Sequence, residues 1–90
     1  MLTIEPTAAF KREVQRLAQR GRNVLKMFTP IAMLLNNQPF PPEYDDHPLK
    51  GKWLGFREFY VEPDWLIIYQ VDNTSLILAR TGNHSDLFKS

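Results

Sequence analysis

The sequence has no cysteine among its 90 residues, and this absence excludes several kinds of chemistry. Disulfide frameworks, thiolate metal sites and cysteine nucleophiles all require that residue, and a chain without it suits a reducing cytoplasm. No apolar run approaches the roughly 20 residues that a membrane-spanning helix needs. The N-terminus also lacks the basic segment followed by an apolar segment that marks a secretory signal. We therefore expect a cytoplasmic protein with no membrane partner.

Motifs for metals and cofactors are equally scarce. The two histidines, His47 and His84, lie far apart, and neither belongs to a His-x-x-x-His pair. The sequence contains no phosphate-binding loop, no Gly-x-Gly-x-x-Gly and no Gly-x-Ser-x-Gly. We expect no metal site and no cofactor, so that any catalysis must come from the side chains themselves.

What the sequence does contain is typical of one globular domain spanning residues 1–90. Hydrophobic residues make up 43% and charged residues 23%, a balance that favours order. Residues 1–42 carry six Lys or Arg against two Glu, net +4, whereas residues 43–90 carry five against eight acidic residues, net −3. The basic half is either a solvated helix face or a surface for a polyanion. Its basic residues are Lys11, Arg12, Arg16, Arg20, Arg22 and Lys26.

Periodicity predicts a strand and two helices in the N-terminal half. Residues 2–5 alternate as a short first or edge strand, and Thr7 is a plausible N-cap for a helix over residues 8–20. Gly21 fits a helix stop. A second helix is expected from Asn23 toward residue 37, broken near residues 27–30 because Pro30 conflicts with a straight helix. Thr29 and Pro30 could alternatively cap a new segment.

The C-terminal half predicts a sheet. Residues 38–52 are proline-rich and irregular, and from residue 53 to 61 the apolar period changes to two. A turn at 62–65, a near-continuous apolar strand at 66–71, a hairpin turn and a strand at 76–80 follow. Residues 81–84 are expected to leave the sheet before a helical turn at 85–88. The predicted fold class is α+β, a helical hairpin on a mostly antiparallel sheet.

Several polar residues of the sheet half are candidates for chemistry. His47 and His84 both lie in polar loops at element ends, where an imidazole can act as acid or base near neutrality. Glu58 and Tyr60 share one face of a strand, which is either a pocket wall or a solvent-facing side. Asp64 lies in a turn, where aspartate is common for structural reasons alone.

Cations and one aromatic side chain could contact an anionic partner. Arg80 ends an otherwise apolar strand, so it is either paired with a carboxylate or directed at an anion. Phe88 is either a plug over the core or a platform for base stacking. Candidate phosphate contacts are Lys50, Lys52, Arg57 and Arg80.

Four motifs together resemble the YafQ family of bacterial toxins, in the RelE/ParE superfamily of type II toxin–antitoxin systems. The motifs are Asp46-His47-Pro48-Leu49-x-Gly51, Gly55-Phe56-Arg57-Glu58, Val61-Glu62-Pro63-Asp64-Trp65 and Arg80-Thr81-Gly82-x-His84 with Leu87-Phe88. The resemblance covers essentially the whole chain. It implies the RelE-like microbial ribonuclease fold and a ribosome-dependent endonuclease that cleaves translated mRNA in the bacterial cytoplasm, held inactive by an antitoxin.

The resemblance also assigns roles to residues. The positions of His47, Asp64 and His84 match active-site residues, and that of Phe88 matches an aromatic residue near the bound RNA. The family aspartate and histidine at two further positions are Glu58 and Tyr60 here. Glutamate keeps the charge, but tyrosine, with a pKa near 10, is a poor base at neutral pH.

Attack by the RNA 2′-hydroxyl needs a base, an acid and cations, which this set can supply. His84 is expected to carry acid–base work, with His47 as the second imidazole. Two alternatives remain: a ParE-like toxin that acts on gyrase, and a weakened toxin that only binds its antitoxin. Tyr60 is the feature that favours the weakened toxin.

Overall fold

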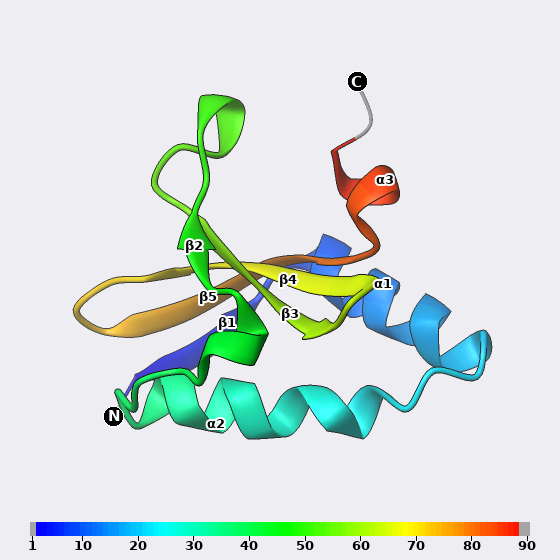
Figure 1. Ribbon diagram of the computed structural model, residues 1–90, viewed down its shortest axis with the longest axis horizontal. Helices are drawn as coiled ribbons and strands as arrows, with labels where there is room; N and C mark the ends of the chain where they lie inside the picture. Colours follow the sequence, from blue (N-terminus) through cyan, green and yellow to red (C-terminus); the bar gives the residue numbers. More distant parts are fainter. Residues whose placement is uncertain (1, 89–90) are drawn as a thin grey trace.

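The computed structural model describes residues 2–88 and contains one mixed sheet with helices on both of its faces (Figure 1). The strands are β1 (Thr3–Pro6), β2 (His47–Pro48), β3 (Arg57–Glu62), β4 (Trp65–Val71) and β5 (Ser75–Gly82). The α-helices are α1 (Ala8–Gln19), α2 (Phe28–Leu35) and α3 (His84–Leu87), and the 3₁₀ helices are η1 (Val24–Met27), η2 (Pro42–Tyr44) and η3 (Gly51–Trp53). This arrangement confirms the predicted α+β class.

The sheet has the strand order β1-β5-β4-β3-β2, and β1 runs parallel to β5 while the other neighbours are antiparallel. β4 is therefore central, as its continuous apolar sequence predicted, and its residues Trp65–Tyr69 are all buried. Both faces of this strand need an apolar cover. Helices α1 and α2 supply it on one side, and η3 and α3 lie on the other.

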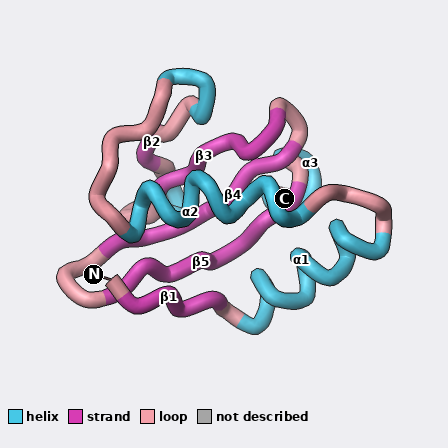
Figure 2. Tube along the Cα trace, turned by 90° about the horizontal axis from the view of Figure 1, so that it is seen from below, coloured by secondary structure: helices cyan, strands magenta, loops and turns pink. Residues whose placement is uncertain are grey.

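The helical pair covers one face of the sheet, as expected (Figure 2). Phe10 of α1 and Ile31 of α2 join a buried cluster with the sheet residues Phe59, Trp65 and Ile67. Thr7 caps α1, since its side chain accepts a hydrogen bond from the Phe10 backbone N–H. The chain leaves this helix through Gly21 at φ +89°, a conformation that favours glycine.

The predicted break in the second helix is present, but its cause differs in detail. Asn23 caps the short η1, and α2 begins at Phe28 rather than after a Thr29–Pro30 cap, so that alternative is wrong. Pro30 occupies the third helical position of α2. Its missing N–H costs no hydrogen bond there, because the first backbone donors of a helix have no acceptor within the helix.

Three predicted boundaries in the sheet half are wrong. The strand expected from residue 53 begins only at Arg57, because residues 51–53 form η3 and Gly55 turns the chain at φ +94°. Within the loop expected to be irregular, His47 and Pro48 form β2 against β3. Strand β5 continues to Gly82, because the buried Thr81 hydroxyl accepts from Trp65 Nε1 and donates to the Leu66 carbonyl.

A second apolar cluster covers the face of the sheet opposite α1 and α2. Leu66, Ile68 and Ala79 form its floor, and Leu87 of α3 packs on them. In Figure 1 the η3 segment and α3 rise from this side of the sheet, away from α2. The partly buried side chains around this cluster are Leu49, Trp53, Phe56, Tyr60 and Phe88. This face carries the candidate site.

Candidate active site

The strand register brings three predicted site residues into one row across the sheet. His47 of β2 lies opposite Glu58 of β3, Glu58 opposite Ile68 of β4, and Ile68 opposite Arg80 of β5. In the next row on this face, Tyr60 lies opposite Leu66 and Leu66 opposite Gly82, two residues before His84. Residues distant in sequence are thus aligned across the sheet because three antiparallel pairings share one register, and of these residues His47 and Glu58 are in direct contact.

Glu58 is a buried carboxylate held by His47. The Nε2 atom of His47 lies 2.6 Å from Glu58 Oε2, and Glu58 is only 3% exposed. The expectation of a solvent-facing side is therefore wrong for this residue. The second oxygen, Oε1, is buried with no hydrogen-bond partner among residues 2–88. A buried carboxylate favours a paired cation, and His47 is the partner that the register provides.

His47 is held at both ring nitrogens and remains 39% exposed. Its Nδ1 lies 2.7 Å from the Asp45 carbonyl oxygen, which can only accept, so this nitrogen carries a proton. Burial lowers the pKa of His47, but the Asp45 hydrogen bond and the nearby Glu58 carboxylate outweigh it and raise the pKa above 6.5. Both ring nitrogens face oxygen acceptors, so the geometry favours the doubly protonated imidazolium over the neutral ring.

Tyr60 lies on the same face of β3 as Glu58 and is a hydrogen-bond donor rather than a base. Burial, followed by the negative charges of Glu58 and Asp45, raises the pKa of its phenol above 10. The hydroxyl is therefore protonated at neutral pH. It can donate a hydrogen bond to a substrate oxygen, but it does not accept a proton in the manner of an imidazole.

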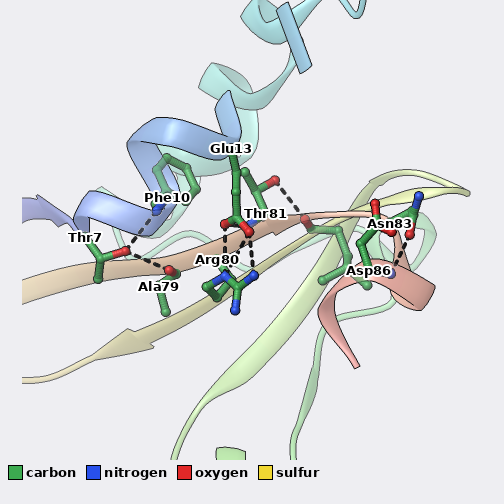
Figure 3. Close-up of polar contacts among 9 residues, drawn as sticks. Thr7, Phe10, Glu13, Ala79, Arg80, Thr81, Asn83 and Asp86 are labelled. Carbon is green, nitrogen blue, oxygen red and sulfur yellow. Dashed lines mark hydrogen bonds and ion pairs between the residues drawn. The ribbon is translucent and has the colours of Figure 1, made fainter. Parts of the chain in front are cut away.

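His84 opens α3 and stacks on Phe88. Their ring centroids are 4.6 Å apart with the planes tilted by 34°. The Asn83 side chain caps this short helix by accepting a hydrogen bond from the Asp86 backbone N–H at 2.7 Å (Figure 3). His84 is exposed, whereas Phe88 packs partly buried against the second cluster. Phe88 thus acts as a plug over the core and also contacts the candidate histidine.

Asp64 lies in the turn between β3 and β4, where Arg22 holds it. Arg22 Nη1 and Nη2 each lie 3.0 Å from a different Asp64 oxygen. Arg22 also contacts Glu62, whose other oxygen lies 2.6 Å from Lys26 Nζ. The Arg22 hydrogen bond holds the pKa of Asp64 below its usual value. Asp64 is therefore a fixed anion, although its side chain is 68% exposed.

An open cavity of about 560 Å³ joins this turn to the start of α3. Asp64, Gly82 and Asn83 line it from the sheet side. Arg16 and Arg20 line it from α1. The cavity thus lies between Asp64, the one predicted catalytic residue that lines it, and the basic helix, and its walls mix cations with carboxylates.

The structure separates the other predicted cations. Arg57 contacts Asp46 through Nη2 at 3.1 Å, and Asp46 also accepts from the Tyr69 hydroxyl, on the α2 side of the sheet. Lys50 and Lys52 are exposed around η3. Arg80 forms a fork with Glu13 of α1. Of these four cations, Arg80 is the one that lies in the row of His47 and Glu58. Arg57 points to the opposite face of the sheet.

Sequence reasoning missed Glu13, Asp45 and Asp46, which hold predicted site residues. Glu13 had a detectable signal, because it is the one acidic residue of α1 and lies beside the apolar stripe of Phe10 and Val14. The two aspartates carried no such signal. Their partners follow from loop geometry, which local pattern does not specify.

Two features are absent from residues 2–88. In this part of the chain, no group of three or more His, Cys, Asp or Glu side chains is placed to hold a metal ion. None of the described helices is long and apolar enough to cross a membrane.

A helical pair packed on one face of a small mixed sheet is the fold of YafQ/RelE-like toxins. The family model for the bacterial toxin of type II toxin–antitoxin systems, YafQ, matches residues 2–89. The chain belongs to the YafQ family.

Similar proteins agree with this family. The mRNA interferase toxin YafQ of Escherichia coli K12 is 38% identical over 86 residues, 94% of each chain. The crystal structure of YafQ from E. coli BL21(DE3) superposes with a TM-score of 0.91 at 36% identity, covering 98% of this chain and 99% of the other. The toxin in the E. coli DinJ–YafQ complex has a TM-score of 0.89 at 37% identity, with 98% and 99% covered. These findings confirm the resemblance.

Proposed function

We propose that this toxin cleaves translated mRNA on the ribosome by acid–base chemistry of its own side chains. As a YafQ toxin, the protein is an mRNA interferase, an endoribonuclease of a type II toxin–antitoxin system. The observation that carries the proposed mechanism is the row of His47, Glu58 and Arg80 across the sheet, bordered by Tyr60 and the exposed His84. Two imidazoles, a guanidinium and a phenol could together supply the acid, base and charge-stabilising groups of such a reaction.

The reaction begins with attack of the RNA 2′-hydroxyl on the adjacent phosphorus, and the 5′-oxygen leaves. One group must take the hydroxyl proton and another must protonate the leaving oxygen. His84 is the group for proton transfer because its ring is exposed on α3. His47, kept as an imidazolium by Glu58 and the Asp45 carbonyl, donates a proton or neutralises the growing negative charge.

The remaining site residues bind and orient. Arg80 stabilises charge on the phosphate, and Tyr60 donates a hydrogen bond to a substrate oxygen. Asp64 is a fixed anion beside Arg22, and it orients neighbouring groups rather than carrying a proton. Lys50 and Lys52 contact the RNA backbone, with Arg57 as a weaker contact because Asp46 holds it on the α2 side of the sheet, away from the row of His47 and Glu58. Phe88 stacks against His84 and a base of the RNA.

The partners follow from the family and from charge. A complex of DinJ with YafQ is known from E. coli, and we propose that a cognate antitoxin neutralises this toxin in the same way in the bacterial cytoplasm. The exposed cations of α1 are proposed to meet ribosomal RNA. They are Lys11, Arg12, Arg16 and Arg20; Arg22 and Lys26 contribute less because Glu62 and Asp64 hold them.

The test is to map mRNA 5′ ends in a cell-free translation reaction with the wild type and the His84→Ala variant. We expect new ends within translated codons for the wild type, and a loss of about 10²-fold or more in the variant, the range for removing a general acid or base. Tyr60→Phe should lose much less, because the phenol transfers no proton. Ser85→Ala, a neighbouring exposed change on α3, is the matched control.

Equal losses in His84→Ala and Tyr60→Phe would contradict the assignment of His84. Intact mRNA with translation still running in the presence of the wild type would contradict the nuclease. A gyrase-type target or a weakened toxin would then be the better interpretation, and Tyr60 in place of the family histidine favours the weakened toxin.

A further inference from the structure

Glu13 of α1 makes a set of contacts that the proposed mechanism has not used. Its carboxylate accepts from Arg80 Nε at 3.0 and 2.9 Å and from Arg80 Nη2 at 2.6 Å, and it also accepts from the Thr81 backbone N–H at 3.1 Å (Figure 3). Its side chain is only 12% exposed. Three donors therefore converge on one nearly buried anion between a helix and a strand.

The position of this contact follows from where β1 ends. β1 pairs with β5 only as far as Pro6 opposite Leu78, so the following residues of β5 have no strand on that side. The start of α1 replaces the missing strand. Thr7 donates to the Ala79 carbonyl at 2.7 Å, and Glu13 accepts from the Thr81 N–H. Glu13 is therefore tied to the β5 backbone as well as to Arg80.

A bidentate contact fixes the plane of a guanidinium. Glu13 occupies the edge of Arg80 formed by Nε and Nη2. The remaining nitrogen, Nη1, has no acceptor among residues 2–88, and the Arg80 side chain is 33% exposed. A guanidinium held along one edge presents its other edge in a fixed direction. It therefore loses less side-chain freedom on binding an anion than an untethered arginine does.

We infer that Glu13 is a positioning residue, which holds Arg80 so that its free edge faces the scissile phosphate. Arg80 lies in the row of Glu58 and His47, so its side chain starts from the face where the reaction is proposed. The inference rests on the proposed function. Glu13 itself touches no substrate and acts through Arg80.

The experiment compares Glu13→Gln with Thr7→Ala in the cell-free cleavage reaction, with the unfolding free energy of each measured in urea. Both changes remove a contact between α1 and β5, but only Glu13 contacts Arg80. We expect Glu13→Gln to lower the cleavage rate per folded molecule by up to about 10²-fold, the cost of a misplaced catalytic group. Thr7→Ala should cleave at the wild-type rate. Rate losses in both variants that follow their stability losses would overturn the inference.

A second comparison tests the coupling between the two residues. Arg80→Lys keeps the charge but loses the fork, so adding Glu13→Gln to it should cause little further loss. Independent, multiplying losses in the double variant would overturn the inference. If Glu13→Gln does not fold, Glu13→Asp takes its place, because it keeps the negative charge while drawing the carboxylate back from the guanidinium by one methylene.

A spectroscopic readout separates this inference from the proposed function. The side-chain Nε–H of Arg80 should give a protected, shifted NMR signal in the wild type that is lost in Glu13→Gln. This signal does not depend on cleavage. If the wild type cleaved no mRNA, the proposed function would fail while the Arg80 signal still reported the contact. An unprotected Nε–H in the wild type would overturn the inference whatever the activity.

Discussion

His47 and Glu58 form a pair in which each residue explains the state of the other. The buried carboxylate needs a cation, and the imidazole needs an anion to remain protonated beside apolar neighbours. Glu58, one methylene longer than the family aspartate, reaches across to β2 and contacts His47. The pair makes His47 a charged group rather than a free base.

The pH dependence of stability tests this state. Because the folded protein raises the pKa of His47 above 6.5, the stabilisation is complete below pH 6.5 and is lost as pH rises through the higher folded value. We expect the contribution of His47 to the wild-type unfolding free energy, measured in urea from pH 5.5 upward, to stay level to pH 6.5 and to fall above it. His47→Gln should remove that fall, and Glu58→Gln should reduce it. Carboxyls with a lowered pKa, such as Asp64 and Asp72, titrate below this window.

If the unfolding free energy of His47→Gln depended on pH as that of the wild type does, another group would be titrating. That result would contradict the assignment of His47 as an imidazolium.

At the scale of elements, α1 contributes to the site although it packs along the edge of β5 and on the sheet face opposite the site. Its first residues close the open edge of β5, its apolar stripe packs on the core, and Glu13 holds Arg80. Its outer face carries exposed cations. One helix therefore links folding, a site residue and the surface proposed to meet RNA.

The N-cap of α1 gives a stability prediction. Thr7 Oγ1 accepts from the Phe10 N–H at 3.0 Å and donates to the Ala79 carbonyl. Thr7→Ala removes both hydrogen bonds and should lower the free energy of unfolding by about 1–2 kcal/mol, the upper range for a lost cap. Urea denaturation provides the measurement. Thr29→Ala, an exposed change in the first turn of α2, is the control and should change it by less than about 0.5 kcal/mol. Equal effects in the two variants would argue against the cap.

At the scale of the whole molecule, the net charge of +1 is too small for a strong free ribonuclease. Ion pairs reduce the basic surface further, since Arg22 and Lys26 meet Glu62 and Asp64. Within the described part of the chain, the exposed cations that have no carboxylate partner are concentrated on α1. A partner that presents the RNA would supply the attraction that this charge distribution lacks, and in the proposed function the ribosome is that partner.

Charge reversal on α1 tests that proposal. Arg12→Glu with Arg16→Glu should weaken sedimentation with ribosomes and reduce the salt dependence of binding, by about one in slope for each lost phosphate contact. Arg12→Lys with Arg16→Lys keeps the charge and should bind as the wild type does. Circular dichroism checks that both variants fold. Unchanged binding after reversal would place the ribosome contact on another surface.

By itself, the sequence determined the features that depend on neighbours along the chain. Helical spacing and the Thr7 cap located α1, a continuous apolar run located β4, and the spaced motifs around His47, Asp64 and His84 identified the family. These signals are local, so they survive without knowledge of the fold. The boundaries around η3 and β2 were missed, because turns at glycine and a two-residue strand carry almost no periodicity.

The tertiary structure decided which charged group meets which. Arg22 holds Asp64 across 42 positions and Glu13 holds Arg80 across 67, while strand register joins His47 to Glu58. Such pairings depend on where a strand ends and which face of a helix turns inward. They result from packing the whole chain around one core, and single-residue patterns do not contain them.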